Sequence, residues 1–486
     1  MTYDLLIIGG GINGCAIARD AAGRGLSVCL CEQNDLASGT SSASTKLIHG
    51  GLRYLELFEF KLVHEALAER ERLLASAPHI IWPLKFVLPY EQGGRPIWML
   101  RLGLYIYDHL TWRKRLDGSR MVRLSGNDYG APLRNEYSLA FTYFDCWVDD
   151  ARFVVLNALD AKERGAEIKI GACVNKARRI GDLWRVKLVD GEELLARSLV
   201  NASGPWVSKV IEDVLQSASQ KHMRLVKGSH IVMRKLYSGD QAYILQNSDG
   251  RIVFVIPYEQ EFTLIGTTDV SFDAPPGPVT ISDSERDYLL SVVNHYWRVP
   301  VTHEEIIYSY SGLRPLYDDG ALNASVVTRD YAFDLDAAQG RAPALSIFGG
   351  KLTTSRRLAE HAVNQLSQFF KHAGPAWTKE AKLPGGESSF EDAYKTLRRQ
   401  GPFLSEGEAY RLARAYGARA TRILKNARIK QDLGHDFGCG LYEAEIAYLK
   451  EHEWARRGED ILWRRSKLGL CMSASQQQAL SAFMGG

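Results

Sequence analysis

Residues 3–32 decide the fold, and they begin with Tyr3-Asp4-Leu5-Leu6-Ile7-Ile8 followed directly by Gly9-Gly10-Gly11-Ile12-Asn13-Gly14. The apolar run predicts a short buried strand, and residues 12–24 predict a helix. A second strand is predicted by Leu26-Ser27-Val28-Cys29-Leu30-Cys31, and it ends at Glu32. A G-x-G-x-x-G pattern between strand and helix, with an acidic residue about 20 positions on, is typical of a βαβ unit that binds a dinucleotide. An ordinary glycine-rich turn does not need all these parts in register.

The three glycines of this pattern have separate tasks. Gly9 permits the tight turn, Gly11 lets the backbone approach a pyrophosphate, and Gly14 lets helix and strand pack closely. Free N–H groups and the positive end of the helix then hold the diphosphate. Glu32 is placed to accept a hydrogen bond from a ribose hydroxyl. We therefore expect nucleotide contacts from Gly9, Gly10, Gly11, Ile12, Asn13, Gly14, Glu32 and Gln33.

The composition is that of a globular protein with two or three domains. The chain has 486 residues, of which 45% are hydrophobic and 24% charged, and this length exceeds that of a single core. The net charge of +3 gives no global attraction for nucleic acid. Seven cysteines without a C-x-x-C pair argue against a disulfide framework and for a reducing compartment.

The sequence lacks the motifs of secreted, membrane-spanning and metal-binding proteins and of hydrolases. No basic segment precedes the first strand, so we expect no signal peptide, and no run approaches the roughly 18 apolar residues that span a bilayer. We expect a cytoplasmic or cytoplasm-facing protein. The absence of H-E-x-x-H and C-x-x-C patterns predicts no metal site, and the absence of G-x-S-x-G disfavours a hydrolase.

The order of motifs predicts an α/β fold in which a Rossmann-type nucleotide-binding domain is interleaved with a β-rich substrate (cap) domain and followed by an all-helical C-terminal domain. The nucleotide-binding parts are expected at residues 1–75, 146–227 and 311–373. Residues 76–145 form a cap or membrane-facing segment, and 228–310 the β-rich domain. A linker at 374–389 leads to helices at 390–486. Capping boxes are expected at Ser282/Glu285, Ser405/Glu408 and Ser475/Gln478.

Three later segments favour a flavin dinucleotide over a nicotinamide one. Residues 199–206 and 265–269 are strand ends rich in small residues, which allow close approach to a flat ligand. Residues 348–354 form a second glycine-rich turn, expected to open a helix from Leu352 to Ser367 whose N–H groups face the electron-rich edge of a reduced flavin. The further expected FAD contacts are Thr40, Ser41, Ser42, Lys46, Leu47, Val174, Ser203, Gly204, Trp206, Gly312, Gly349, Gly350, Leu352 and Thr353.

These segments carry a family resemblance. Residues 9–14, 40–54, 145–152, 265–269, 310–316, 328–331 and 348–354 resemble the aerobic FAD-dependent glycerol-3-phosphate dehydrogenases, and the likeness covers nearly the full length. One mild departure is Ala202-Ser203-Gly204, where related flavoproteins often have Ala-Thr-Gly. The resemblance implies oxidation of sn-glycerol 3-phosphate to dihydroxyacetone phosphate, with electrons passed to a membrane quinone.

Basic residues in these segments suit such a substrate. A guanidinium binds a phosphate monoester bidentately, and Arg314 and Arg329 lie at expected strand ends, with Lys351 in the second glycine turn. Hydride transfer also requires a base for the C2 hydroxyl, and arginine cannot serve. His49 is our candidate base, with a backbone-bonded structural histidine as the alternative and Lys351 as the competing base. Arg53 and Tyr54 are expected in the same pocket.

Two segments bear on membrane contact. Residues 95–107 are apolar and aromatic and precede Trp112-Arg113-Lys114-Arg115, a combination that suits the lipid headgroup boundary. A buried cap-domain helix is the alternative. Residues 411–430 contain seven Lys/Arg and no acid, and they face either anionic lipid or solvent. We expect peripheral or monotopic association with the cytoplasmic face of the inner membrane. The oligomeric state stays open, a homodimer being one option.

Two competing functions remain at this point. The nearest is an amino-acid-oxidase-like FAD enzyme that uses oxygen, which would need a clamp for a carboxylate. The other is a flavin-binding structural or RNA-associated protein, whose footprint would be residues 411–430. No aromatic-and-basic nucleic-acid motif is present, so no nucleic-acid partner is expected.

Overall fold

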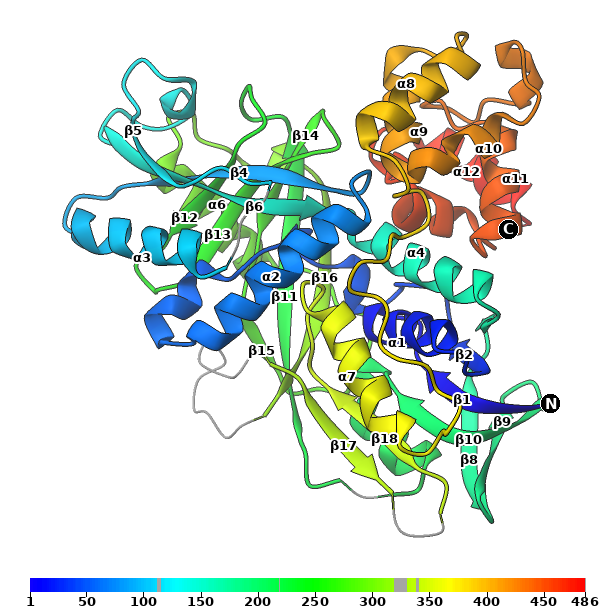
Figure 1. Ribbon diagram of the computed structural model, residues 1–486. Helices are drawn as coiled ribbons and strands as arrows, with labels where there is room; N and C mark the ends of the chain where they lie inside the picture. Colours follow the sequence, from blue (N-terminus) through cyan, green and yellow to red (C-terminus); the bar gives the residue numbers. More distant parts are fainter. Residues whose placement is uncertain (112–114, 218, 319–329, 338–340, 486) are drawn as a thin grey trace.

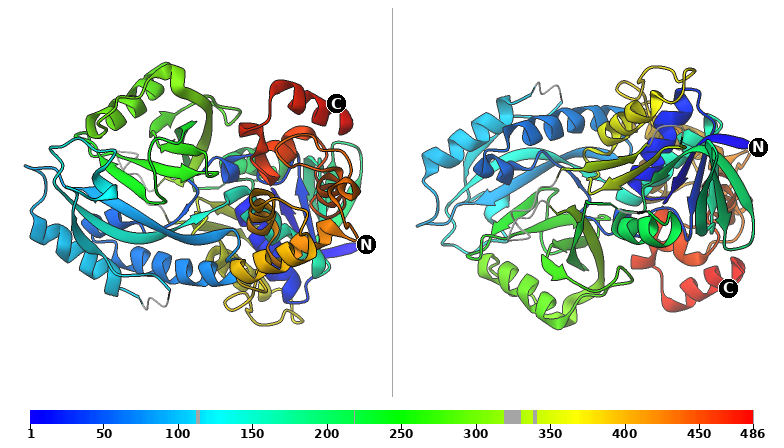
Figure 2. Two further views of the ribbon diagram at one scale, coloured as in Figure 1. Left: turned by 90° about the horizontal axis from the view of Figure 1, so that it is seen from above. Right: turned by 90° about the horizontal axis from the view of Figure 1, so that it is seen from below.

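A computed structural model describes residues 1–111, 115–217, 219–318, 330–337 and 341–485 (Figure 1). Arg329 and residues 112–114, which carry two of the predictions above, lie outside the described part of the chain. Two large sheets and a helical domain make up the molecule, and the helical domain packs beside the nucleotide-binding half (Figure 2).

The first sheet is built around the glycine-turn unit. In space its strands run β17 (Ala332–Asp336), β18 (Ala344–Phe348), β10 (Glu193–Asn201), β1 (Thr2–Ile8), β2 (Val28–Glu32) and β7 (Glu167–Ile170), with the hairpin β8 (Val174–Ile180) and β9 (Leu183–Leu188) attached to β10. The pairs β18–β10, β10–β1, β1–β2 and β2–β7 are parallel. The central strands β1 and β18 are mostly apolar, because both faces of the sheet are covered there.

Helices on one face of this sheet form its larger core. They are α1 (Ile12–Gly23), α4 (Asp150–Glu163) and α7 (Ser355–Ser367). The other face is covered by the β8–β9 hairpin and the short helical segments between Gly204 and Val214. Because β1, β2, β10 and β18 run in one direction, their carboxyl ends meet at one edge, which is where open α/β sheets bind ligands.

The second sheet combines segments that the sequence analysis separates. Its strands are β3 (Leu47–Ile48), β4 (Ile81–Pro89), β5 (Arg120–Arg123), β6 (Leu139–Val148), β11 (Met223–Arg234), β12 (Ala242–Gln246), β13 (Ile252–Tyr258), β14 (Phe262–Gly266), β15 (Val270–Phe272) and β16 (Ile306–Tyr317). The parallel pairing of β12 with β4 joins residues 76–145 to the β-rich domain. The strand β16 also continues past residue 310, so residues 311–317 belong to this sheet and not to the nucleotide-binding part.

Three helices cover the second sheet. The helix α6 (Asp283–Tyr296) packs on one face, and α2 (Phe60–Ser76) and α3 (Ile97–His109) pack on the other (Figure 1). The α6 capping box is confirmed, since Ser282 accepts from the Glu285 N–H while the Glu285 carboxylate accepts from the Ser282 N–H.

The C-terminal domain is helical, as expected. It contains α8 (Phe390–Gln400), α9 (Glu406–Tyr416), α10 (Ala420–Leu424), α11 (Glu443–His452) and α12 (Ala474–Phe483) around a core of its own. The capping box Ser405/Glu408 is confirmed. The one expected at Ser475/Gln478 is wrong: the helix begins at Ala474, so Ser473 and Gln476 form the box.

Candidate functional site

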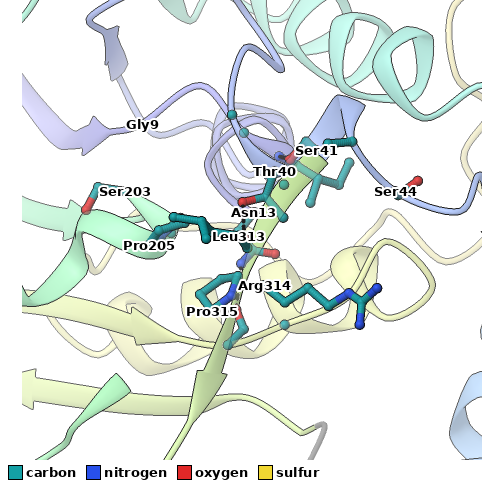
Figure 3. A pocket seen from close by; sticks show the side chains of 18 of the residues that line it. Gly9, Asn13, Thr40, Ser41, Ser44, Ser203, Pro205, Leu313, Arg314 and Pro315 are labelled. Atoms are coloured by element: carbon teal, nitrogen blue, oxygen red, sulfur yellow. Dashed lines mark hydrogen bonds between the residues drawn. The ribbon is translucent and has the colours of Figure 1, made fainter. Parts of the chain in front are cut away.

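A cavity of about 1060 Å³ lies where the carboxyl ends of the first sheet meet β16 and the segment after residue 38 (Figure 3). Ligand pockets are commonly about 300–1,000 Å³, so this cavity has room for a dinucleotide together with a small substrate. Its wall is shared by both sheets, and residues from the glycine turn and from β16 face each other across it.

The geometry of the first glycine turn explains each glycine. Gly9 has φ +111°, and a Cβ there would lie 2.6 Å from the Ala202 carbonyl oxygen. A Cβ on Gly14 would lie 2.0 Å from the Gly9 oxygen, so any larger residue would push α1 away from β1. Gly11 borders the cavity, where a Cβ would meet only the Ser41 hydroxyl, at 3.2 Å. The turn therefore leaves backbone open to the cavity, and it fits a pyrophosphate.

The acid at the end of β2 is held by backbone. The Glu32 carboxylate accepts hydrogen bonds from the N–H groups of Gly10 and Asn34, each at 2.7 Å. Burial raises the pKa of Glu32, although these two N–H donors oppose the shift. Glu32, Gln33 and Val174 all border the cavity. The predicted bond from Glu32 to a ribose hydroxyl remains a prediction.

The second glycine turn lies against the first. The Asn13 side-chain amide donates to the Gly349 carbonyl oxygen at 3.1 Å, and Gly349 and Gly350 have φ values of +80° and +103°. The helix expected from Leu352 begins instead at Ser355, since residues 351–354 form a separate turn in which the Thr354 N–H donates to the Lys351 oxygen. Two turns from distant parts of the sequence thus border one end of the cavity together.

The small-residue loop closes the cavity on the side of β16. The Thr40 hydroxyl donates to the Leu313 carbonyl oxygen at 2.6 Å, and a Cβ on Gly312 would lie 2.7 Å from the Ala43 Cβ. Most of the expected FAD contacts border the cavity: Gly9, Gly11, Ile12, Asn13, Glu32, Gln33, Thr40, Ser41, Leu47, Val174, Ser203, Gly204, Trp206, Gly312, Gly349, Gly350, Leu352 and Thr353.

Four expected FAD contacts lie behind the wall of the cavity. They are Gly10, Gly14, Ser42 and Lys46. Lys46 is 1% exposed, and its ammonium donates to Asp150 at 2.7 Å and to the Ser42 carbonyl oxygen at 3.2 Å. This side chain holds the loop from behind, because a φ of +59° at Lys46 turns the chain sharply at that point.

The expected substrate residues His49, Arg53, Tyr54, Arg314 and Lys351 all border the cavity. The Lys351 ammonium lies 4.4 Å from the centre of the Tyr54 ring. The backbone N–H of His49 donates to the Thr353 hydroxyl at 3.3 Å. Arg314 extends from β16 (Figure 3), and it donates to the Asp269 carboxylate and, at 2.5 Å, to the Thr267 hydroxyl.

Three residues near this region were not predicted. Thr45 and Asp269 border the cavity. The Thr45 hydroxyl lies 3.0 Å from His230 Nε2, and the buried imidazole stacks on the Tyr310 ring. Burial, with the charges of Arg314 and Lys46, holds the pKa of His230 well below its usual value, so the ring is neutral. Asp269 could have been found as the only acid in the strand-end segment 265–269; nothing in the sequence indicated His230.

Comparisons with known proteins identify the class. A family model described as FAD dependent oxidoreductase matches residues 4–356, and one described as the C-terminal domain of alpha-glycerophosphate oxidase matches residues 376–484. The protein is therefore an FAD-dependent oxidoreductase, which confirms the expected cofactor and fold class. More particularly, the chain belongs to the FAD-dependent glycerol-3-phosphate dehydrogenase family, as its relatives show.

Three relatives support this placement. The chain is 53% identical to a glycerol-3-phosphate dehydrogenase of Pseudomonas aeruginosa, over 99% of this chain and 95% of the relative. It is 48% identical to a D-erythritol 1-phosphate dehydrogenase of Brucella abortus, over 98% and 97% of the two chains. The crystal structure of a glycerol-3-phosphate dehydrogenase from Bacillus halodurans, complexed with FAD, matches with a TM-score of 0.74 and 26% identity, over 99% of this chain and 94% of that one.

Proposed function

We propose that the protein oxidises sn-glycerol 3-phosphate to dihydroxyacetone phosphate and passes the electrons to a membrane quinone. The observation that carries this proposal is the group of cations, Arg53, Arg314 and Lys351, on the wall of the FAD cavity. A phosphate monoester is close to a dianion at neutral pH, and charge-assisted hydrogen bonds to it contribute about 1.5–3 kcal/mol each. Arg329, which lies outside the described residues, stays a candidate fourth cation.

The two candidate bases differ in their surroundings. When FAD is bound, it supplies the acceptor for the hydride that leaves C2 of the substrate. Lys351 lies over the face of Tyr54, and a ring face stabilises the charged ammonium. This contact favours Lys351 as a phosphate ligand and leaves an imidazole nitrogen of His49 to take the proton from the C2 hydroxyl. A neutral imidazole has one ring nitrogen that can accept that proton.

A longer polyol phosphate is a second candidate substrate. The likeness to a D-erythritol 1-phosphate dehydrogenase is nearly as strong as that to the glycerol-3-phosphate enzymes, and the same cations would bind either phosphate. The amino-acid-oxidase alternative is weaker, because a small amino acid carries a single carboxylate and needs fewer cations.

Anaerobic reduction of the flavin tests the substrate directly. We expect glycerol 3-phosphate to bleach the flavin absorbance of the purified holoenzyme within seconds, whereas glycerol, which lacks the phosphate, reacts at least 100-fold more slowly at equal concentration. Faster bleaching by D-erythritol 1-phosphate would transfer the assignment to that substrate. Bleaching by amino acids, and by neither polyol phosphate, would overturn the proposal.

The electron acceptor is tested in a second stage. Turnover with glycerol 3-phosphate is measured with a short-chain quinone and, separately, with dissolved oxygen. We expect reoxidation of the flavin by the quinone to exceed reoxidation by oxygen by at least tenfold, with little peroxide formed. Stoichiometric peroxide and no response to quinone would identify an oxidase instead.

We also infer that an exposed apolar patch docks the protein on the cytoplasmic face of the inner membrane, as a peripheral or monotopic protein. The patch consists of Phe58, Phe60, Trp98, Met99, Leu102 and Tyr105, which come from α3, the first residue of α2 and the turn before it. Phe58 is 78% and Trp98 64% exposed, and isolated monomers rarely expose such aromatic clusters without a partner surface. Leu57, next to Phe58, borders the cavity, which would give a lipid-soluble quinone a short path to the flavin.

Two further observations bear on the membrane. In the described part of the chain, no helix is both long and apolar enough to cross a bilayer. Four of the seven basic residues in the stretch 411–430 are engaged within the protein: Arg411 pairs with Glu445, Arg419 with Glu163, and Lys430 with Glu408, while Arg414 stacks on Phe390. The other three, Arg422, Lys425 and Arg428, are exposed. These contacts reduce the basic surface that residues 411–430 offer to lipid or RNA, and we therefore prefer the apolar patch as the membrane contact.

A further inference from the structure

Arg314 is fixed in one orientation by acceptors from a single strand end. One terminal nitrogen of its guanidinium donates to the Asp269 carboxylate, and the other donates to the Thr267 hydroxyl at 2.5 Å and to the Thr268 carbonyl oxygen at 3.3 Å. Asp269, Thr267 and Arg314 all border the cavity. A guanidinium bound on both terminal nitrogens cannot rotate about its own axis, so the direction of its remaining donors is set by this strand end.

The neighbouring strand leaves room for this arrangement. Arg314 on β16 lies opposite Val226 on β11, and Gly228 follows two residues further on. A Cβ on Gly228 would lie 2.2 Å from an Arg314 terminal nitrogen and 2.9 Å from the Thr267 hydroxyl oxygen. Any other residue at 228 would therefore displace the guanidinium from Asp269 and Thr267.

We propose that Asp269 is a positioning residue, which holds the Arg314 guanidinium in the orientation that binds the phosphate of the substrate. This inference rests on the proposed function for the identity of the substrate. Asp269 acts through Arg314. The Thr267 hydroxyl accepts a second hydrogen bond from the same guanidinium, which is weaker because this acceptor is neutral. The ion pair also holds the arginine in place before the substrate arrives, so that less side-chain entropy is lost on binding.

A carboxylate at this place has two opposite effects on an anion, and their balance is measurable. By orienting Arg314 it strengthens phosphate binding, and by its own negative charge it repels the same phosphate. If repulsion dominated, Asp269→Asn would tighten phosphate binding, because the amide is isosteric and neutral. If positioning dominates, the same substitution weakens phosphate binding, because the charge-assisted bond that fixes the guanidinium is lost.

The experiment compares Asp269→Asn with the unaltered holoenzyme in two assays. Inorganic phosphate is titrated against the flavin spectrum, and steady-state kinetics are measured with glycerol 3-phosphate and with glycerol. We expect the Kd for inorganic phosphate and the KM for glycerol 3-phosphate to rise at least tenfold, with kcat changed less than threefold. The kcat/KM for glycerol should stay unchanged, which a general structural defect would not allow.

Matched variants separate positioning from charge and from folding. Asp269→Glu should recover phosphate binding to within about threefold of the original, and Thr267→Val should weaken it about threefold. Asp273→Asn removes an exposed negative charge nearby and should change nothing. When Arg314 is already replaced by lysine, the further substitution Asp269→Asn should raise the Kd for inorganic phosphate by less than twofold, because the guanidinium that Asp269 orients is absent.

Tighter or unchanged phosphate binding in Asp269→Asn would overturn the inference. So would a fall in kcat/KM for glycerol as large as the fall for glycerol 3-phosphate. The phosphate titration also separates this inference from the proposed function. If the unaltered enzyme binds inorganic phosphate with the expected dependence on Asp269 but glycerol 3-phosphate does not reduce its flavin, only the substrate assignment fails. If it binds no phosphate, both fail.

Discussion

In the proposed mechanism, His49 takes the proton and Lys351 binds the phosphate, so two residues of one cavity wall divide proton transfer from binding. Each could serve as a base, but the Lys351 ammonium lies against the Tyr54 ring, which stabilises its charge. A residue that must stay positive to bind a phosphate is poorly suited to accept a proton in the same step. The imidazole of His49, on the same cavity wall, is free of that conflict.

The first prediction concerns His49. Replacing it by asparagine should slow flavin reduction by glycerol 3-phosphate about 10²–10⁴-fold, the usual contribution of a general base. In the original enzyme the reduction rate should fall at low pH, because a protonated imidazole cannot accept a further proton, and this dependence should vanish in His49→Asn. Stopped-flow absorbance across pH 5.5–8.5 measures both.

The control for this prediction is His372→Asn. His372 is 57% exposed at its side chain and lies 3.2 Å from Asp4, away from the cavity, so its loss should leave rate and pH profile unaltered. Lys351→Met should instead raise KM. A full rate and an unchanged pH profile in His49→Asn would show that the base lies elsewhere.

Residue types in sequence motifs predicted the cations and His49 but not the direction of every side chain. Arg53, Tyr54, Arg314 and Lys351 do border the cavity, because they sit in segments that had to approach a flat ligand. Lys46 sits in the same run and points the other way, owing to a left-handed backbone conformation that residue type alone does not reveal. The position of His230 beside the cavity results from the pairing of β11 with β14 and β16, strands that are distant in the sequence, so no local pattern predicts it.

At the scale of elements, the cap of helix α6 is bonded to β11 and to the segment that follows β14. Glu285 accepts from the Ser282 N–H as part of the capping box, and it also accepts from the hydroxyls of Thr268 and Ser229 and pairs with Lys227. The sequence predicts the box, because Ser and Glu stand at the required spacing. The second role could not be predicted, since it arises where β11 meets the segment that follows β14.

We predict that Glu285→Gln destabilises the protein in a pH-dependent way. Burial raises the pKa of Glu285, but Lys227 and the N–H and hydroxyl donors outweigh it and bring the pKa to about 2. The stabilisation is therefore complete above the unfolded pKa of about 4.3 and is lost as the pH falls towards 2. Urea unfolding at pH 7 should show a loss of about 1–3 kcal/mol.

The difference between the two proteins should shrink steadily from pH 4.5 downwards. Asp283→Asn is the matched control, because Asp283 loses the same charge on the same helix but its side chain is 88% exposed. Its free energy of unfolding should change by no more than about 0.5 kcal/mol. A Glu285→Gln protein that is as stable as the original at pH 7 would contradict the assigned network.

The exposed side of helix α3 leads to a prediction about membrane binding. Leu104 and Tyr107 on one side of α3 are buried, while Trp98 and Leu102 on the other are exposed, so the helix is both a cap-domain element and a candidate lipid-facing one. The triple variant Phe58→Ser, Trp98→Ser, Leu102→Ser should be released from washed membranes by salt that leaves the original bound. Its turnover with a water-soluble dye should be unaffected.

Serine at Val189 and Val299 is the control for the membrane experiment. These two residues are 66% and 70% exposed and lie outside the apolar patch, so the same kind of substitution there should not alter membrane retention. If the patch variant and the control variant bind membranes equally, the apolar patch serves another partner.

At the scale of the whole molecule, the helical domain is joined to the nucleotide end of the cavity through buried charges. Arg465, which is fully buried, donates to both oxygens of Asp35 at 2.7 and 2.8 Å. Asp35 follows Gln33 and Asn34, which border the cavity. Arg152 on α4 forms a second buried pair with Glu453. The C-terminal domain thus fixes the loop that follows β2.

We therefore predict that Arg465→Met lowers both stability and FAD affinity. Burial raises the pKa of Asp35, but Arg465 and Arg464 outweigh it and keep the carboxylate charged, so removing Arg465 leaves a buried charge with Arg464 alone. Breaking a buried pair in this way costs about 3–5 kcal/mol. Calorimetry should show a lower Tm, and titration of the apoprotein with FAD a Kd raised at least tenfold.

The control is Arg457→Met. Arg457 forms an exposed pair with Glu459, so its loss should change the free energy of unfolding by no more than about 0.5 kcal/mol. If Arg465→Met lowers the Tm but binds FAD as tightly as the original, the helical domain stabilises the protein without shaping its cofactor site.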